Sequence, residues 1–204
     1  RIAALPLTVA DCTFDLRERA TSSGFERATT TITLSGDGET GRGEDVTYTN
    51  EAHHALIEHD VDLAGEYTVE EFSAALADAT LWPDPPDQDR FRHYRRWGFE
   101  SAALDLALKQ ADTSLGAALG RTYDPVDFVV STRLSNPDDN QPPTTDRLDA
   151  LLGIHDALAF KLDPTPEWDD TLLTSLSDYD VRVLDLKGLY EDERIANDPD
   201  PEFY

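Results

Sequence analysis

The sequence predicts a mixed fold in two parts: a region of antiparallel strands and helices, followed by βα units that build a parallel sheet. Two observations predict it. Short β-rich segments separated by turn residues fill the first third of the chain, and amphipathic helices follow them. After residue 123, three short apolar strands recur at regular intervals with a helix between each pair, which is typical of right-handed βαβ units. With 39% hydrophobic residues in 204, the chain can bury a sizeable core.

The first third predicts a small antiparallel sheet. We expect strands over 2–10, 27–34 and 43–48, with a glycine-containing turn at 35–38 between the last two. The polar segment 11–25 lies between the first two strands, and we expect it to be a mobile loop.

Helices are predicted next. Thr68 and Glu71 have the spacing of a capping box in front of the apolar face that begins at Phe72. Residues 90–110 form the clearest helical pattern, and their many alanines indicate close packing against another element. A short continuation over 111–120 should end at Gly120.

The remaining segments predict the parallel sheet. We expect strands over 127–132, 156–162 and 181–186, with an amphipathic segment ending in Leu152 and a helix over 168–176 between them. Four charged residues fall at the C-terminal ends of these strands, where parallel α/β folds collect catalytic groups: Lys161, Asp163, Asp185 and Lys187.

The charge balance excludes two classes of partner. Seventeen Lys and Arg against 42 Asp and Glu give a formal net charge of −25, which repels nucleic acid and anionic membranes. The acids are spread along the whole chain, and only three lysines occur. This pattern resembles proteins of salt-loving archaea, whose acidic surfaces suit concentrated salt. An acidic interaction protein that binds basic partners is the competing interpretation.

Other sequence features concern the compartment and the extent of the chain. A single cysteine, Cys12, excludes an internal disulfide and is expected to be a small buried apolar group. No apolar run has the length of a membrane span and no signal peptide is visible, so we expect a cytoplasmic protein. The chain has no methionine and stops just after proline-rich punctuation, so we expect that it is part of a longer polypeptide.

Three stretches in this order resemble the enolase superfamily, of the mandelate racemase and muconate lactonizing type. Gly43-Glu44-Asp45-Val46-Thr47-Tyr48 resembles the Gly-x-Gly-Glu strand of that family's capping domain. The alanine-rich stretch 101–108, followed by Gly116 and Gly120, resembles the helix before the barrel. Segments 160–163 and 184–188 resemble the ends of the second and third barrel strands.

The resemblance implies an α+β capping domain over residues 1–122 and the start of a (β/α) TIM-type barrel, its first three βα units, over 123–204. It also implies Mg²⁺-assisted removal of a proton next to a carboxylate, in which the metal stabilises the enediolate. The full-length protein would be a lyase or isomerase, such as a dehydratase, racemase or cycloisomerase. Its substrate would be a small carboxylate or an acid sugar, and a homo-oligomer is one expected assembly.

The resemblance also assigns roles to residues. Asp185 matches the first of three metal-binding carboxylates, and the other two would lie beyond Tyr204. Lys161 matches the first lysine of a Lys-x-Lys pair, but Asp163 stands where that family has the second lysine, its usual base. Lys187 follows Asp185 by two residues and would point the same way if the strand stays regular, so its two candidate roles are a base and a partial replacement for the metal cation. A solvated or ion-paired role for these side chains is the alternative.

In the family, loops of the capping domain close over the substrate and exclude water. Phe14 and Phe25 in the segment 11–25, and Tyr48, occupy those places here, with ordinary loop packing as the alternative. The histidines at 53, 54 and 59 are expected to be solvated or packing residues, and the arginines at 92, 95 and 96 to form ion pairs. Two rival interpretations remain: a barrel of this lineage that has lost catalysis and serves as a scaffold, and an unrelated acidic α+β domain that is complete in 204 residues.

Overall fold

The computed structural model describes residues 1–21, 26–135 and 142–186, and it divides into two compact units, Arg1–Asp124 and Pro125–Tyr204. It is a mixed α/β protein, as predicted. Among the described residues, none of the helices combines the length and the apolar character that a membrane span needs.

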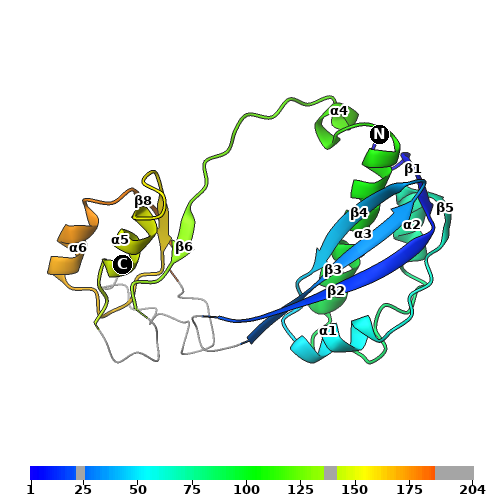
Figure 1. The fold of residues 1–204 in the computed structure, drawn as a ribbon. Coiled ribbons are helices and arrows are strands. Elements are labelled where there is room, and N and C mark those ends of the chain that lie inside the picture. Colours follow the sequence, from blue (N-terminus) through cyan, green and yellow to red (C-terminus); the bar gives the residue numbers. More distant parts are fainter. Residues whose placement is uncertain (22–25, 136–141, 187–204) are drawn as a thin grey trace. The chain divides into compact units, whose positions relative to one another are not determined.

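The first unit contains a three-stranded antiparallel sheet in the order β2-β3-β4 and a separate antiparallel pair, β1 with β5 (Figure 1). The strands are β1 (Pro6–Val9), β2 (Asp11–Ala20), β3 (Glu26–Gly36), β4 (Glu39–Asp45) and β5 (Gly65–Thr68). The predicted antiparallel sheet and its 35–38 turn are confirmed, and Asp37 and Gly38 adopt positive φ there. The third strand, however, begins before Gly43 and ends at Asp45.

Two expectations for the N-terminal segments are wrong, one about a loop and one about a strand's partner. The segment predicted as a loop, 11–25, holds β2, whose residues 11–20 pair with β3. The segment 2–10 contributes β1, which pairs with β5 and not with the segment 27–34. Residues 11–20 form a strand because their apolar side chains recur at every second position. Cys12, Phe14 and Leu16 turn toward the protein, and the residues between them are exposed. A long run of charged residues hid this alternation.

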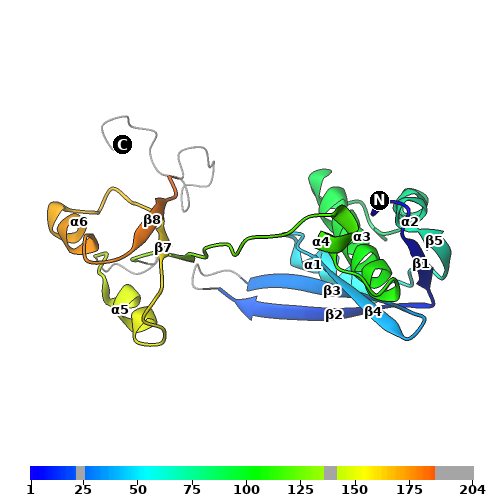
Figure 2. The ribbon, with the colours of Figure 1, turned by 90° about the horizontal axis from the view of Figure 1, so that it is seen from above.

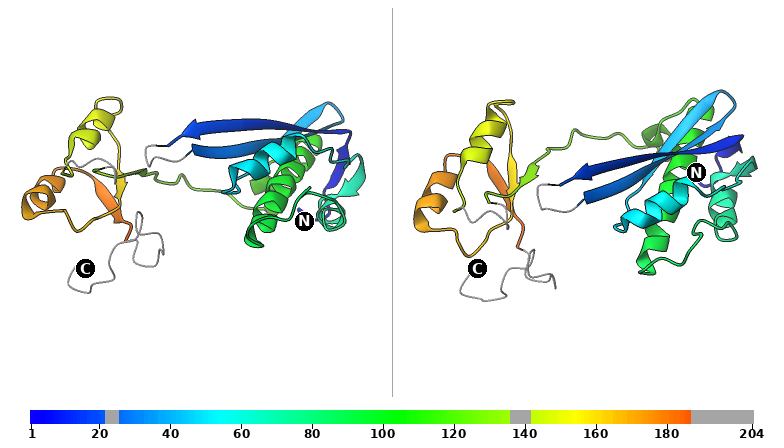
Figure 3. Two further views of the ribbon diagram at one scale, coloured as in Figure 1. Left: turned by 90° about the horizontal axis from the view of Figure 1, so that it is seen from below. Right: turned by 60° about the horizontal axis from the view of Figure 1, so that its bottom comes forward.

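Four helices complete the first unit. They are α1 (Asn50–Ile57), α2 (Val69–Ala75), α3 (Arg90–Gln110) and α4 (Leu115–Leu119). The predicted capping box at α2 is present, with Thr68 and Glu71 bonded reciprocally. Gly120 ends α4 in the left-handed conformation at φ 66°, as predicted. Helices α1 and α3 cover the same face of the β2–β4 sheet (Figure 3).

The long helix α3 approaches β4 very closely, which explains the glycines of the strand. A Cβ atom at Gly43 would lie 1.9 Å from the carbonyl oxygen of Gly98 on α3, and one at Gly41 would lie 2.2 Å from that of Ala102. The expectation that the alanine-rich helix packs closely is therefore confirmed. The core beneath it includes Phe72, Phe99 and Leu106, and Cys12 packs against its edge. Burial raises the pKa of the Cys12 thiol to about 12, which fits a packing role.

The second unit is a parallel sheet in the order β6-β7-β8 with helices between the strands (Figure 2). Its elements are β6 (Val130–Thr132), α5 (Asp146–Leu152), β7 (Phe160–Leu162), α6 (Asp170–Leu176) and β8 (Val181–Leu184). The predicted order of elements is confirmed. The strands are shorter than the expected 127–132, 156–162 and 181–186, because only the last three residues of the first two ranges and the first four of the third form strands.

Both helices of this unit cover one face of its sheet. Leu148 of α5 and Leu172 of α6 pack in one cluster with Phe160 and Leu162 of β7. Since side chains alternate along a strand, Lys161 between those two points to the opposite face.

Candidate functional site

A row of three charged residues crosses the C-terminal end of the parallel sheet. Arg133, Asp163 and Asp185 are each the first residue after a strand, β6, β7 and β8 respectively. The last paired residues of the three strands are in register, Thr132 with Leu162 and Leu162 with Leu184. The row therefore lies at the sheet edge where parallel α/β proteins place their reactive groups.

The row belongs to the face of the sheet opposite helices α5 and α6. Lys161 pairs in register with Ser131 on one side and Val183 on the other. Arg133, Asp163 and Asp185 each lie two residues further along these strands, so they point to the same face as this triplet. The residues in between, Thr132, Leu162 and Leu184, point to the opposite face, where Leu162 packs against α5 and α6.

Two ion pairs organise this face. The Nζ atom of Lys161 donates to Oδ2 of Asp185 across neighbouring strands. The Nε atom of Arg133 donates to Oδ2 of Asp163 at 3.2 Å. The side chains of Lys161 and Asp185 are 26% and 30% exposed, and those of Arg133 and Asp163 are 25% and 14% exposed. All four groups are thus partly withdrawn from water, which strengthens charge-assisted hydrogen bonds.

The structure brings together some of the residues that the sequence singled out. Lys161 and Asp185 are in direct contact, while Asp163 contacts Arg133. Lys187 lies outside the described residues. Sequence reasoning did not select Arg133, although its place directly after an apolar strand was a usable signal.

The three aromatic residues predicted to lie in substrate loops have three different outcomes. Phe14 is on strand β2 and packs edge-on against Phe99 of α3, with 6.0 Å between ring centroids, so its assignment to a mobile loop is wrong. Phe25 lies outside the described residues. Tyr48 follows β4 and is 66% exposed, with the guanidinium carbon of Arg27 4.4 Å from its ring centroid.

The described carboxylates at this sheet edge provide fewer ligands than a magnesium ion needs. Mg²⁺ prefers six oxygen ligands in octahedral geometry, including carboxylates and water. Here the Asp185 carboxylate already accepts from Lys161, and within the described residues no group of three His, Cys, Asp or Glu side chains converges on a point. The described residues alone do not fit a magnesium site, so no chemical step is derived through one.

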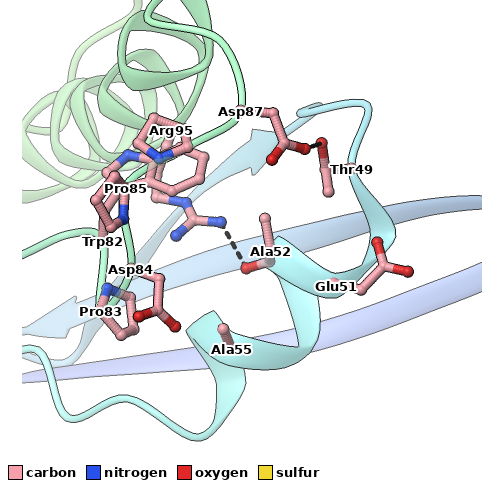
Figure 4. A pocket seen from close by; sticks show the side chains of 11 residues that line it. Thr49, Glu51, Ala52, Ala55, Trp82, Pro83, Asp84, Pro85, Asp87 and Arg95 are labelled. Carbon is pink, nitrogen blue, oxygen red and sulfur yellow. Dashed lines mark hydrogen bonds between the residues drawn. The ribbon is translucent and has the colours of Figure 1, made fainter.

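A second site of interest lies in the first unit, where a cavity of about 160 Å³ opens between α1 and the proline-rich segment 82–87 (Figure 4). Arg95 of α3 closes its floor, with no exposed side-chain surface. Its Nε atom donates to Asp45 Oδ2 at 2.7 Å, and its Nη1 and Nη2 atoms donate to the carbonyls of Leu81 and Ala52. The Arg95 guanidinium also stacks over Trp82, with its carbon 3.7 Å from the ring centroid.

The contacts of Arg95 assign it a structural role. It joins β4, α1, α3 and the segment that ends in Trp82, elements that are far apart in the sequence. Burial lowers the pKa of the guanidinium, and the Asp45 carboxylate opposes that shift. The expected ion pairing of the arginines is confirmed, since Arg96 also pairs with Glu100 and Arg92 with Asp89.

The histidines are packing or surface groups. His53 is buried, with its Nδ1 atom 2.9 Å from the Thr30 hydroxyl and its Nε2 atom 2.9 Å from the Thr47 carbonyl. A neutral ring satisfies both contacts, by accepting from Thr30 and donating to Thr47. Burial accordingly lowers the pKa of His53 below its ordinary 6.5. His54 contacts Glu18, and His59 contacts a backbone carbonyl.

Almost the whole chain matches the two domains of one protein family. Residues 1–118 match the family described as "Domain of unknown function (DUF8230) N-terminal domain", and residues 122–204 match "Domain of unknown function (DUF8230) C-terminal domain". The chain belongs to the DUF8230 family. No curated protein matches it.

Among solved structures, the chain is weakly similar to one described as "L-Ala-D/L-Glu Epimerase". The identity is 14% and the TM-score is 0.37, and the likeness covers 85% of this chain and 61% of the epimerase chain. The chain thus spans less than two thirds of that enzyme's length. A likeness this weak assigns neither substrate nor reaction.

Proposed function

We propose that the C-terminal end of the parallel sheet, on the face opposite α5 and α6, is an acid–base site. It would move a proton on the carbon next to the carboxylate of a small organic acid. The observation that carries this proposal is the Lys161–Asp185 pair at the C-terminal end of two parallel strands. Parallel α/β proteins build their reactive centres from side chains at this edge.

Lys161 is the proton-transferring group of the proposal. The ammonium that is paired with Asp185 first gives a proton to solvent, and the neutral amine then takes a proton from the substrate carbon and becomes an ammonium ion again. Asp185 already accepts a hydrogen bond from Nζ, so its carboxylate is in place to stabilise that ammonium. The return of the proton, to the same carbon or with departure of a leaving group, would decide between an isomerase and a lyase.

Several further assignments belong to the same proposal. Residues 1–122 would form an enolase-like capping domain, and residues 123–204 would belong to a barrel. Lys187 and Asp163 would have reactive roles, and Asp185 would bind a magnesium ion together with ligands from outside the described residues. The location would be cytoplasmic. Magnesium is tested by calorimetric titration of the natural polypeptide before and after treatment with a chelator.

The proposal is tested by hydrogen exchange. The natural polypeptide is incubated in D₂O with a panel of 2-hydroxy acids, 2-amino acids and acid sugars, and loss of the α-proton signal is followed by NMR with and without Mg²⁺. We expect exchange in at least one acid, and a fall of roughly 10²-fold or more in Lys161→Met, because general acid–base groups contribute that much.

A matched control separates chemistry from a lost lysine charge. Lys109 on α3 is a surface lysine bonded to Asp105, so Lys109→Met makes the same substitution away from the site. It should leave exchange unchanged. Equal rates in Lys161→Met and Lys109→Met would overturn the proposed role of Lys161.

A scaffold function without catalysis is the second candidate, and one observation favours it. Asp163 takes the place where the similar family has its lysine base, and it is bonded to Arg133. Two ion pairs side by side are also what a structural network would look like. Absence of exchange across the panel, together with no magnesium binding by calorimetry, would favour the scaffold.

A further inference from the structure

The guanidinium of Arg133 is held by one end only. Its Nε atom donates to Asp163, a mostly buried carboxylate. Among the described residues, its Nη1 and Nη2 atoms have no hydrogen-bond or ion-pair partner, although three quarters of the side-chain surface is covered. Neither atom is among the buried side-chain donors that lack a partner in the described residues, so these four N–H donors reach solvent and are open to a ligand.

The geometry of the anchor suggests what the donors bind. A guanidinium fixed through Nε keeps its two terminal nitrogens parallel, and that fork matches the two oxygens of a carboxylate. Because Asp163 holds the side chain in place, little side-chain freedom remains to be lost on binding. Asp163 also neutralises the charge of Arg133, so the attraction would come from directed hydrogen bonds more than from net charge.

The position of Arg133 near Lys161 also favours a carboxylate as its ligand. Arg133 directly follows β6, and Lys161 lies on the neighbouring strand β7. Both point to the same face of the sheet, since Ser131 pairs with Lys161 and Arg133 lies two residues beyond Ser131. A small acid whose carboxylate rests on Arg133 would present its adjacent carbon toward the strand that carries Lys161. In a chain with a net charge of −25, directed donors are needed to attract an anion at all.

We infer that Arg133 binds the carboxylate of a small organic acid through its Nη1 and Nη2 atoms, and that it is the substrate-orienting residue of the site. This inference rests on the proposed function for the choice of a carboxylate. The binding itself does not require that any reaction follow.

The inference is tested by NMR of the arginine Nε–Hε signals in the ¹⁵N-labelled natural polypeptide. The Arg133 signal is assigned by its absence from Arg133→Gln. L-lactate and malonate are then titrated at constant ionic strength, with inorganic phosphate as a comparison anion. We expect a saturable shift of the Arg133 signal with the carboxylates, and affinity about tenfold or more weaker in Arg133→Gln by the shifts of neighbouring backbone amides.

Two further variants sharpen the result. Arg133→Lys keeps the charge but loses the fork, so it should bind several-fold more weakly than the unaltered protein. Arg147 is an exposed arginine on α5, whose leucines face the covered side of the sheet, so Arg147→Gln removes the same charge elsewhere and should bind as the unaltered protein does.

Each outcome decides the matter. No saturable shift at Arg133 with either carboxylate, or equal weakening in Arg147→Gln, would overturn the inference. Saturation by phosphate alone would overturn the choice of a carboxylate. Failure of the proposed function is distinguishable, because the α-proton would then not exchange although the Arg133 signal still responds.

Discussion

At the scale of single residues, the buried ion pair of Arg95 and Asp45 is the contact on which the stability of the first unit most clearly depends. Neither side chain has any exposed surface, and each makes further hydrogen bonds, Arg95 to two carbonyls and Asp45 to the Thr47 backbone and hydroxyl. A charge removed from water in this way is tolerated only while its partner remains. Loss of one partner therefore costs far more than the pair itself contributes.

Arg95→Met should lower the free energy of unfolding by about 3–5 kcal/mol, because it leaves the Asp45 carboxylate buried without its cation. The measurement is chemical denaturation followed by far-UV circular dichroism. Arg92→Met on the same helix is the control, since Arg92 is half-exposed with a distant partner, and it should change stability by less than about 0.5 kcal/mol. Equal stability of the two variants would show that the Arg95 contacts do not hold the unit together.

At the scale of elements, the contact of α3 with β4 depends on the absence of side chains. Gly43 and Gly98 face each other with their backbones nearly touching, and the Gly-x-Gly spacing on β4 keeps both glycines on the face that meets the helix. The strand pattern that suggested a family resemblance thus has a packing explanation in this chain.

Gly43→Ala should destabilise the protein by about 1–3 kcal/mol, because its Cβ would overlap a backbone carbonyl that cannot rotate away. Thermal unfolding gives the measurement. In Gly153→Ala the new Cβ would meet its nearest atoms at 3.4 Å, so this control should stay within about 0.5 kcal/mol of the unaltered protein. A Gly43→Ala variant as stable as the control would contradict the close approach.

At the scale of the whole molecule, the net charge of −25 acts on every part of the chain. Like charges repel, and folding brings them closer together than they are in the unfolded chain. Salt shortens the range of this repulsion from about 10 Å at 0.1 M to about 3 Å at 1 M. Stability should therefore depend on salt more than is usual for a protein of this size.

The midpoints of thermal unfolding should rise by at least about 4 °C between 0.1 M and 2 M NaCl, which corresponds to a gain of roughly 1–2 kcal/mol. Calorimetry measures the midpoints. A triple variant, Asp60→Asn, Asp78→Asn and Asp156→Asn, removes exposed acids and should show a smaller rise. Midpoints that do not change with salt, or an unchanged slope in the triple variant, would show that repulsion is not what limits stability.

The sequence by itself determined the features that neighbouring residues create. The capping box at Thr68, the alanine-rich helix, the glycine at the end of α4 and the alternation of strands and helices after residue 123 all follow from spacing along the chain. It also identified Lys161 and Asp185 as residues near strand ends, because a strand that stops at a charged residue is a local signal.

Only the tertiary structure decided the features that depend on distant contacts. Four such features are the place of β2 in its sheet, the pairing of β1 with β5, the Arg133–Asp163 contact and the Arg95–Asp45 pair. Each joins segments that are separated in sequence, and Arg95 and Asp45 are 50 positions apart. The physical reason is that burial and pairing are properties of the packed chain. A charged segment such as 11–20 becomes a strand because one face finds a core to cover, and a side chain such as Arg133 is oriented because another strand supplies its carboxylate.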